Sequence, residues 1–189
     1  RKGSGRSKVE ERAKTTKQKI HFCEAMALVH RKNSERSAEH WRYEGRVVCR
    51  GDKIADEEGY YAVFSEQGTS ASLSASGKFL DAISRFPGND GEDADAESAY
   101  TQSLLGSSAV DNSETWVSLP KSQWPKHWHG KYHDPVVPLR LSLYGHPLAG
   151  LFWEQHCQKA VKAAGFESIP GWECLFVHRE SVSYTHLTL

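Results

Sequence analysis

The C-terminal third of the chain constrains the fold most, because strand-like and helix-like patterns follow one another within it. PVVPLRLSLYG (135–145) is an apolar run typical of a strand. In the next segment, 146–166, Pro147 suits the first turn of a helix, side chains recur at turn spacing, and Gly165 follows the last turn. WECLFVH (172–178) reads as a closing strand. These patterns predict a mixed α and β fold.

An earlier part of the chain predicts a β-hairpin. KIHFCEAMALVH (19–30) and RYEGRVVCRGDK (42–53) read as strands, and the polar stretch 31–41 reads as a long loop between them. Residues 1–50 carry 14 Lys/Arg and 6 Asp/Glu, which is a net charge of +8 (14 − 6). We therefore expect a basic hairpin that binds nucleic acid through charge and releases it as salt rises.

Two further segments complete the outline. In 69–85, apolar side chains recur near helical spacing and stop before a Pro-Gly pair, which predicts a helix. Residues 1–18 are rich in Lys, Arg, Ser, Thr and Gly and hold few aliphatic side chains, so we expect a basic flexible linker, apart from a short helix near 9–17.

The overall charge argues against several classes of protein. The chain of 189 residues carries 24 basic and 24 acidic residues. A net charge of zero does not fit a histone-like tail or an acidic disordered domain. The charge is nevertheless uneven, because residues 51–114 carry 3 basic and 13 acidic residues, a net charge of −10 (3 − 13).

Hydropathy and cysteine use bear on location. No apolar stretch approaches the roughly 20 residues that cross a bilayer, and no apolar segment follows the N-terminal charges. The four cysteines include no Cys-x-x-Cys pair. We therefore expect an intracellular protein with no membrane partner, whose cysteines are reduced and mostly buried.

Four segments carry a resemblance to a known family: RVVCRGDK (46–53), DAESAYTQ (95–102), LRLSLYGHPLAGLFWEQHC (139–157) and GFESIPGWECLFVH (165–178). In order and spacing they resemble the copia-type retrotransposon reverse transcriptase. The family's own strings run approximately KARLVARG, DVKTAFLNG, RLKKSLYGLKQAPRAWY, and GF followed by a D-x-CLF strand. The resemblance covers about residues 19–180, and four ordered motifs are more specific than any one of them.

The resemblance implies an α+β right-hand polymerase fold, in which 19–180 would form the fingers and the N-terminal part of the palm. It implies an RNA-directed DNA polymerase from a Gag-Pol polyprotein that adds deoxynucleotides to a primer 3′-hydroxyl by two-metal catalysis with Mg²⁺, or alternatively Mn²⁺. The implied partners are an RNA template, a DNA or tRNA primer, deoxynucleoside triphosphates, and the remaining palm, thumb and RNase H regions of the polyprotein. The implied locations are a cytoplasmic particle and the nucleus.

Asp95 is the candidate catalytic and metal-ligating residue. In the family, the aspartate at this place ends a palm strand and binds both metal ions, which require hard oxygen ligands. From the residues alone, Asp95 lies in an acidic run that also suits a solvated loop. The choice of Asp95 over its acidic neighbours therefore comes from the resemblance.

Tyr100 is a candidate nucleotide-binding residue, five positions after Asp95. In the resembling enzymes an aromatic ring at this place lies under the sugar of the incoming nucleotide and would collide with a 2′-hydroxyl. A tyrosine packed in the core is the alternative interpretation.

Arg46, Arg50, Tyr144 and Gly145 are the other candidate nucleotide-binding residues. Arg46 and Arg50 lie four apart on the predicted second hairpin strand, which places them on one face. Guanidinium groups bind phosphate oxygens well, and basic residues in this segment of the family resemble triphosphate ligands. Charged protection of a strand edge is the alternative.

Tyr144 and Gly145 match a family turn beside the incoming nucleotide, where glycine allows close backbone approach. An ordinary helix N-terminus is the alternative.

A Trp/His-rich loop at 122–134 admits three interpretations. His127, His129 and His133 suggest a zinc-binding module, although a structural zinc site wants a fourth ligand. Tryptophan and tyrosine rings interleaved with lysines suggest contact with nucleic acid. The third interpretation is a solvated loop with aromatic anchors, and it is the one we favour from the sequence.

The last residues depart from the family. The family continues past the CLF strand into a Tyr-Val-Asp-Asp hairpin whose aspartates complete the metal site. Here the chain reads SVSYTHLTL from Ser181 onward. We interpret 19–180 as a partial domain truncated before that hairpin and 181–189 as an unrelated tail, and we expect no DNA synthesis by this chain. A non-catalytic nucleic-acid-binding remnant of a transposable element is the rival hypothesis.

Overall fold

The computed structural model describes residues 4–64, 74–92, 94–106, 112–181 and 183–186. Helices and strands follow one another in mixed order: β1 (Ser4–Gly5), α1 (Arg6–Thr16), β2 (Ile20–Lys32), β3 (Arg42–Cys49), α2 (Ser74–Ser84), β4 (Glu114–Ser118), β5 (Pro135–Leu139), α3 (Ala149–Ala163), β6 (Glu167–Ser168), β7 (Leu175–His178) and β8 (Ser183–His186). Short 3-10 helices join them: η1 (Ala38–His40), η2 (Gly51–Lys53), η3 (Ala99–Gln102), η4 (Lys121–Gln123) and η5 (Lys126–Trp128).

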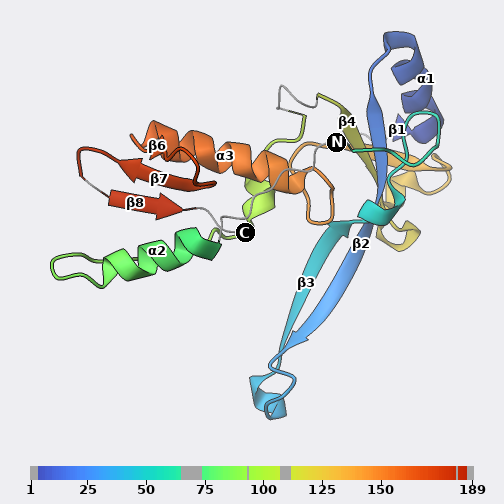
Figure 1. Cartoon of the computed structure of the whole chain (residues 1–189). Coiled ribbons are helices and arrows are strands. Elements are labelled where there is room, and N and C mark those ends of the chain that lie inside the picture. The colour runs from blue at the N-terminus through green and yellow to red at the C-terminus, as the bar shows by residue number, and fades with distance from the viewer. Residues whose placement is uncertain (1–3, 65–73, 93, 107–111, 182, 187–189) are drawn as a thin grey trace.

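Two β-sheets organise these elements. The larger sheet has the strand order β1-β5-β4-β2-β3, in which β2 and β4 are parallel and the other neighbours antiparallel. The smaller sheet, β6-β7-β8, is antiparallel throughout. The larger sheet lies on one side of the molecule with α1, and the smaller sheet lies on the other with α2 and α3 (Figure 1). The prediction of a mixed α and β fold is confirmed.

The predicted hairpin is confirmed as β2 and β3, which pair from Ala25↔Cys49 to Lys32↔Arg42. The first residues of β2 are buried in the sheet, whereas most side chains beyond Ala25 are exposed. The outer part of the hairpin projects from the molecule as a two-stranded ribbon (Figure 1).

Residues 6–16 form α1, which begins three residues before the short helix expected near 9–17 and is packed where a flexible linker was expected over 1–18. Val9 and Ala13, four residues apart on one helix face, are buried. Two apolar side chains on one face of a polar helix suffice when a sheet covers them. They join a core cluster with Ile20, Phe22, Trp116 and Val136.

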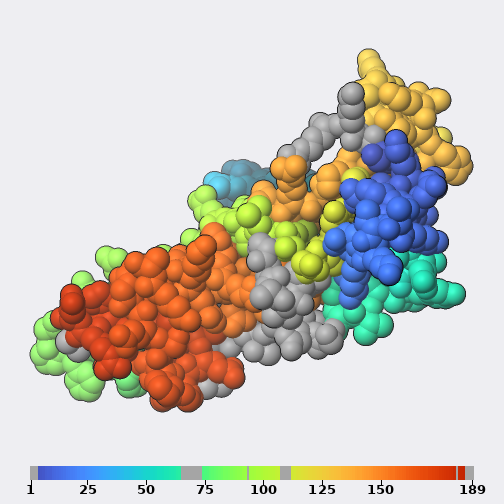
Figure 2. Space-filling view, turned by 90° about the horizontal axis from the view of Figure 1, so that it is seen from above, coloured from blue at the N-terminus to red at the C-terminus, as the bar shows by residue number. Residues whose placement is uncertain are grey.

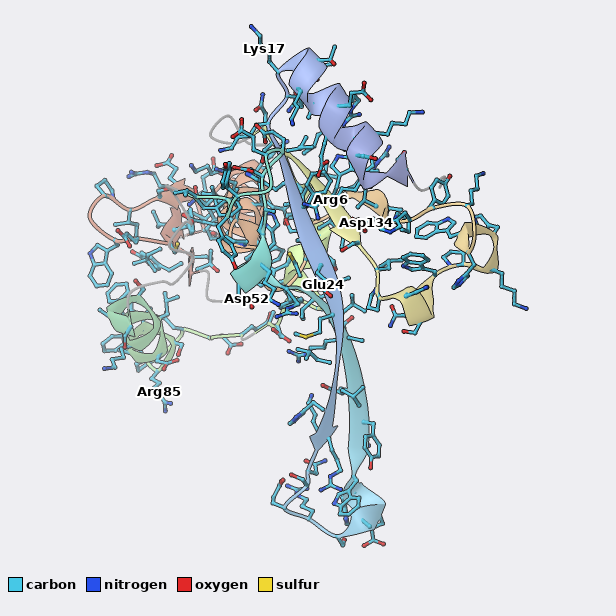
Figure 3. All side chains as sticks on the ribbon, turned by 90° about the vertical axis from the view of Figure 1, so that its right-hand side faces the viewer. Arg6, Lys17, Glu24, Asp52, Arg85 and Asp134 are labelled. Atoms are coloured by element: carbon cyan, nitrogen blue, oxygen red, sulfur yellow. The ribbon has the colours of Figure 1, made fainter. Side chains whose placement is uncertain are left out.

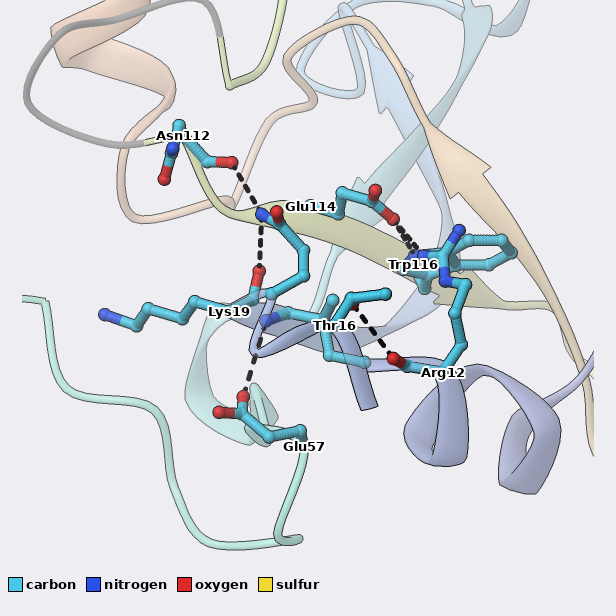
Figure 4. A network of polar contacts seen from close by, with 9 residues as sticks. Arg12, Thr16, Lys19, Glu57, Asn112, Glu114 and Trp116 are labelled. Atoms are coloured by element: carbon cyan, nitrogen blue, oxygen red, sulfur yellow. Dashed lines mark hydrogen bonds and ion pairs between the residues drawn. The ribbon is translucent and has the colours of Figure 1, made fainter. Parts of the chain in front are cut away.

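Polar contacts fix α1 on the sheet (Figure 4). The Arg12 guanidinium lies over the Trp116 ring, 5.3 Å from its centroid, and forms an ion pair with Glu114. The start of β2 is held from the other side, because the Ile20 N–H donates to Glu57 Oε2 at 3.3 Å. The helix is therefore an integral part of the larger sheet's domain.

The smaller sheet packs against α2, where Phe79 contacts Trp172 (centroids 5.5 Å apart) and Tyr184 (5.9 Å). The helix predicted over 69–85 is present as α2, and 69–73 lie outside the described residues. β8 pairs with β7 from Leu175↔His186 to His178↔Ser183. Part of the segment taken as an unrelated tail therefore supplies an edge strand, because any extended segment can pair with the free edge of β7.

The helix predicted after residue 145 is α3, with Phe152 and Trp153 buried. β5 ends at Leu139, earlier than the strand predicted over 135–145. Seen from above, α3 and β7 gather at one end of an elongated molecule and α1 lies at the other (Figure 2). Within the described residues, no helix has the length and apolar character needed to cross a bilayer.

Candidate nucleotide-binding site

The site begins where the chain after η3 runs antiparallel to the chain after β5. Leu104 and Leu141 form a bridge, and the Ser142 N–H donates to the Ser103 carbonyl at 2.9 Å. The Ser103 and Ser142 hydroxyl oxygens lie 3.0 Å apart in a hydrogen bond, and both serines are buried. In an antiparallel pair, residues that precede a paired residue in one segment lie opposite residues that follow its partner in the other segment. This register therefore brings η3 next to the turn at Tyr144.

Tyr100 and Tyr144 meet at this point. Their ring centroids lie 4.6 Å apart at an interplanar angle of 60°, and both residues are half-buried. The Ser103 hydroxyl donates to the Tyr100 carbonyl at 2.9 Å and so fixes the backbone that carries the ring. The two aromatic residues predicted for the site, 44 positions apart in the sequence (144 − 100), form one contact.

Arg46 and Arg50 differ in what holds them. The Arg46 guanidinium carbon lies 6.0 Å from the centroid of the Tyr144 ring, and its side chain is 64% exposed. Among the described residues, Arg46 forms one ion pair, which is long, with 3.9 Å between Nη2 and Oε2 of Glu44. Arg50 is 27% exposed and contacts Glu24 and Asp52, each at 3.3 Å. Because two carboxylates already neutralise Arg50, Arg46 is the arginine available to an anion at this site.

Gly145 sits where two backbone segments nearly touch. The Cys49 N–H donates to the Tyr144 carbonyl at 2.7 Å. Gly145 has φ +82°, and a Cβ on it would lie 2.1 Å from the Cys49 carbonyl oxygen. Gly51 is equally constrained, because its Cβ would lie 2.3 Å from the Gly145 carbonyl oxygen. Only glycine fits at either position without moving the backbone.

Sequence reasoning singled out Gly145 and missed Gly51, although Gly51 stands in the quoted motif RVVCRGDK. It also missed His146. The Leu148 N–H donates to His146 Nδ1 at 3.2 Å, so Nε2 of the neutral ring carries the hydrogen that faces Thr115 Oγ1 at 3.1 Å. The buried imidazole thus joins the turn after Tyr144 to β4 and to the start of α3.

Asp95 lies in an exposed segment without regular structure before η3. The resemblance implied a strand ending there, and none forms over 94–98, where aspartate and glutamate are poor strand formers. The described residues contain no group of three or more His, Cys, Asp or Glu side chains that could hold a metal ion. Asp95 therefore offers one carboxylate, which does not make a metal site by itself.

The histidines of the Trp/His-rich loop are not gathered into a ligand set either, within the part of the chain that the structure describes. The His127 ring contacts Trp128 with centroids 6.3 Å apart, and the His129 ring contacts Trp124 at 5.7 Å. The zinc-binding alternative gains no support from this arrangement.

No family model matches the chain, and no curated protein and no solved structure matches it. The resemblance to copia-type reverse transcriptases therefore stays a prediction. What carries a functional argument is the convergence of Arg46, Tyr100, Tyr144 and Gly145 from three segments of the chain.

All four cysteines are free, and Cys157 is the one that is not buried. Cys49 is the cysteine whose backbone contacts the site. A hydrogen bond with Cys23 and burial together raise the pKa of the Cys49 thiol. A protonated thiol is a poor nucleophile and a poor metal ligand. Cys49 thus contributes to the site through its backbone, which contacts Tyr144 and Gly145.

An open groove of about 510 Å³ lies elsewhere, between α1, β4 and β5. Arg12, Glu114, Trp116 and Arg140 are among the residues that line it, and none of the predicted site residues does. The predicted residues therefore form a surface site that is separate from this groove.

Proposed function

We propose that this chain is the fingers and N-terminal palm part of a copia-type RNA-directed DNA polymerase and that the site around Tyr144 binds a deoxynucleoside triphosphate. The observation that supports the proposal is the grouping of Arg46 and Tyr100 around the Tyr144 ring, beside the close backbone contact at Gly145. A cation beside two aromatic rings suits a ligand that has both phosphates and a flat base. In the cell, the proposal implies an intracellular particle as the place of action.

Each residue has a role in this proposal. Arg46 binds triphosphate oxygens, because its guanidinium is exposed and charged. The Tyr144 ring offers a face to the base or sugar, and Tyr100 excludes a 2′-hydroxyl by filling the space beside C2′. Gly145 allows the Cys49 backbone to pack against the turn that carries Tyr144, and so fixes the position of that ring. Asp95 would supply one carboxylate oxygen ligand to Mg²⁺ or Mn²⁺.

A calorimetric titration of the 189-residue chain with dATP in the presence of Mg²⁺ tests the proposal. Arg46→Gln should weaken dATP binding about tenfold, equal to about 1.4 kcal/mol, because it removes a charge-assisted contact. Arg42→Gln is the matched control, since Arg42 is an exposed arginine on the same strand with the same change of charge. Equal weakening by both variants would contradict a specific role for Arg46.

Sugar selection gives a second readout. The chain should bind dATP more tightly than ATP, and Tyr100→Val should reduce that preference, because a smaller side chain leaves room for the 2′-hydroxyl. If the preference is the same in the variant, Tyr100 is a core residue only.

The rival function is a nucleic-acid-binding remnant without nucleotide binding, and the projecting hairpin favours it. However, part of the positive charge in the first 50 residues is already paired. Lys32 contacts Glu44 at 2.6 Å, and Arg50 contacts two carboxylates. The remnant hypothesis expects oligonucleotide binding with no measurable dATP binding, so the same titration distinguishes the two functions.

A further inference from the structure

The loop between β4 and β5 has a regular construction that the proposed nucleotide site does not use. Its sequence PKSQWPKHWHGKYH covers residues 120–133, which we call the tandem-turn loop. It contains three lysines and three histidines and no aspartate or glutamate. Cationic and aromatic side chains alternate along this segment, so the loop combines positive charge with aromatic rings.

The loop repeats one backbone conformation. Pro120 has φ −53° and ψ 140° before η4, and Pro125 has φ −55° and ψ 143° before η5. The residues that follow the two turns are also alike, with φ −68° and ψ 134° at Trp124 and φ −62° and ψ 132° at His129. Each turn begins with a lysine directly after its proline. The repeat therefore presents Lys121 and Lys126 in equivalent local geometry.

Aromatic anchors hold the loop in place. Trp128 is 3% exposed, and the Trp124 indole N–H donates to the Leu119 carbonyl at 2.8 Å. The Tyr132 N–H donates to the Trp128 carbonyl at 3.2 Å, and the two rings contact each other with centroids 6.3 Å apart. A loop that is ordered before binding loses little conformational freedom when a ligand arrives.

The lysines of the loop are exposed, and Lys131 Nζ lies over the Tyr132 ring, 5.5 Å from its centroid. Lys121, Lys126 and Lys131 are all exposed, and none of them forms an ion pair with a described residue. Trp124 and Tyr132 remain partly exposed beside them. In Figure 3 the loop's side chains spread away from the sheet on the side of the labelled Asp134, and in Figure 2 the loop projects at the end opposite α3.

We propose that the tandem-turn loop is a docking surface for single-stranded nucleic acid, separate from the site around Tyr144. Unpaired lysines bind successive phosphates, and the partly exposed rings of Trp124 and Tyr132 stack on bases. An acidic protein would match the charge but would offer carboxylates in place of the flat bases that the rings accept. The combination of cations with available rings therefore favours a polynucleotide over an acidic protein.

Fluorescence anisotropy with a labelled single-stranded oligonucleotide of about 20 thymidines tests the proposal on the full chain between about 50 and 200 mM salt. The triple variant Lys121→Gln, Lys126→Gln, Lys131→Gln should lower the steepness of log affinity against log salt by about 2, since each phosphate contact on a single strand contributes about 0.7. The control is Lys14→Gln, Lys159→Gln, Lys162→Gln, which removes three exposed lysines from α1 and α3. An equal change in both variants would overturn the proposal.

Stacking and specificity are tested in the same assay. Trp124→Leu and Tyr132→Leu should each weaken oligonucleotide binding by about fivefold or more, while circular dichroism and thermal unfolding report whether the variants fold. Poly-glutamate should compete poorly. If poly-glutamate binds as tightly as the oligonucleotide and folded leucine variants bind normally, the loop is a surface for acidic protein. Loop variants should keep wild-type dATP affinity, and a parallel loss would show that the loop and the nucleotide site are one.

Discussion

Glycine is required at position 145 for two reasons, its left-handed backbone conformation and its close contact with the Cys49 carbonyl oxygen. Three glycine-to-alanine variants separate the energetic costs of these two features. Gly171 has φ +80°, and no atom lies within 4 Å of the place that a Cβ would take, so Gly171→Ala tests the left-handed conformation alone. Gly51 has no positive φ, and its Cβ would lie 2.3 Å from the Gly145 carbonyl oxygen, so Gly51→Ala tests the contact alone. Gly145→Ala combines both.

The magnitudes follow from these geometries. A left-handed non-glycine residue costs about 1 to 2 kcal/mol. Forcing backbone segments apart costs about 1 to 3 kcal/mol by analogy with overpacking, and the hydrogen bond from Cys49 N–H to the Tyr144 carbonyl is worth about 1 kcal/mol. We expect the free energy of unfolding to fall by about 1 kcal/mol in Gly171→Ala, about 2 in Gly51→Ala and about 3 or more in Gly145→Ala.

Urea unfolding followed by tryptophan fluorescence measures these differences. Gly51→Ala and Gly145→Ala should also weaken dATP binding, because both displace the backbone that carries Tyr144. Gly171→Ala should leave dATP binding unchanged. If Gly145→Ala is no more destabilising than Gly171→Ala, the 49–51 segment does not press on the turn at Gly145, and the reasoning about this site fails.

Two further predictions concern α1 and α3. Ala13→Asp should release α1 from the sheet because it buries an unpaired charge, and faster hydrogen exchange over 6–16 should report this, whereas Lys14→Asp on the exposed face should not. Burial and the neighbouring Glu173 raise the pKa of Glu154 above its ordinary value of 4.5. The contribution of Glu154 to the free energy of unfolding is therefore fully present below about pH 4.5 and is lost as pH rises through the higher pKa of the folded state. In Glu154→Gln the free energy of unfolding should not show this decrease with pH. If the free energy of unfolding depends on pH equally in the wild type and in Glu154→Gln, the prediction is contradicted.

The placement of Asp95 shows how a resemblance and a fold can diverge locally. The family pattern assigns a strand end to this position, but a strand exists only when another strand pairs with it. Asp95 lies in an acidic, exposed segment that pairs with no neighbour among the described residues. Its role as a metal ligand consequently rests on the resemblance, whereas the grouping of Tyr100 with Tyr144 has a geometric basis.

Local sequence was enough to predict the hairpin, α2 and α3, because hydrophobic periodicity and Pro/Gly punctuation act over a few neighbouring residues. The resemblance, and not these local signals, placed Gly145 at a turn. The local signals allowed a short helix near 9–17 but could not show that α1 would pack on the protein, since that packing depends on Val9 and Ala13 meeting a sheet built from distant strands.

The choice between the two arginines of the site depends on the folded chain. Arg46 and Arg50 are alike in sequence, and the difference arises because Glu24 and Asp52 come within 3.3 Å of Arg50 while Tyr144 lies beside Arg46. The need for glycine at position 51 has the same origin, because it depends on a backbone oxygen 94 residues away (145 − 51). Contacts between distant segments form only when the whole chain has folded, so no local pattern encodes them.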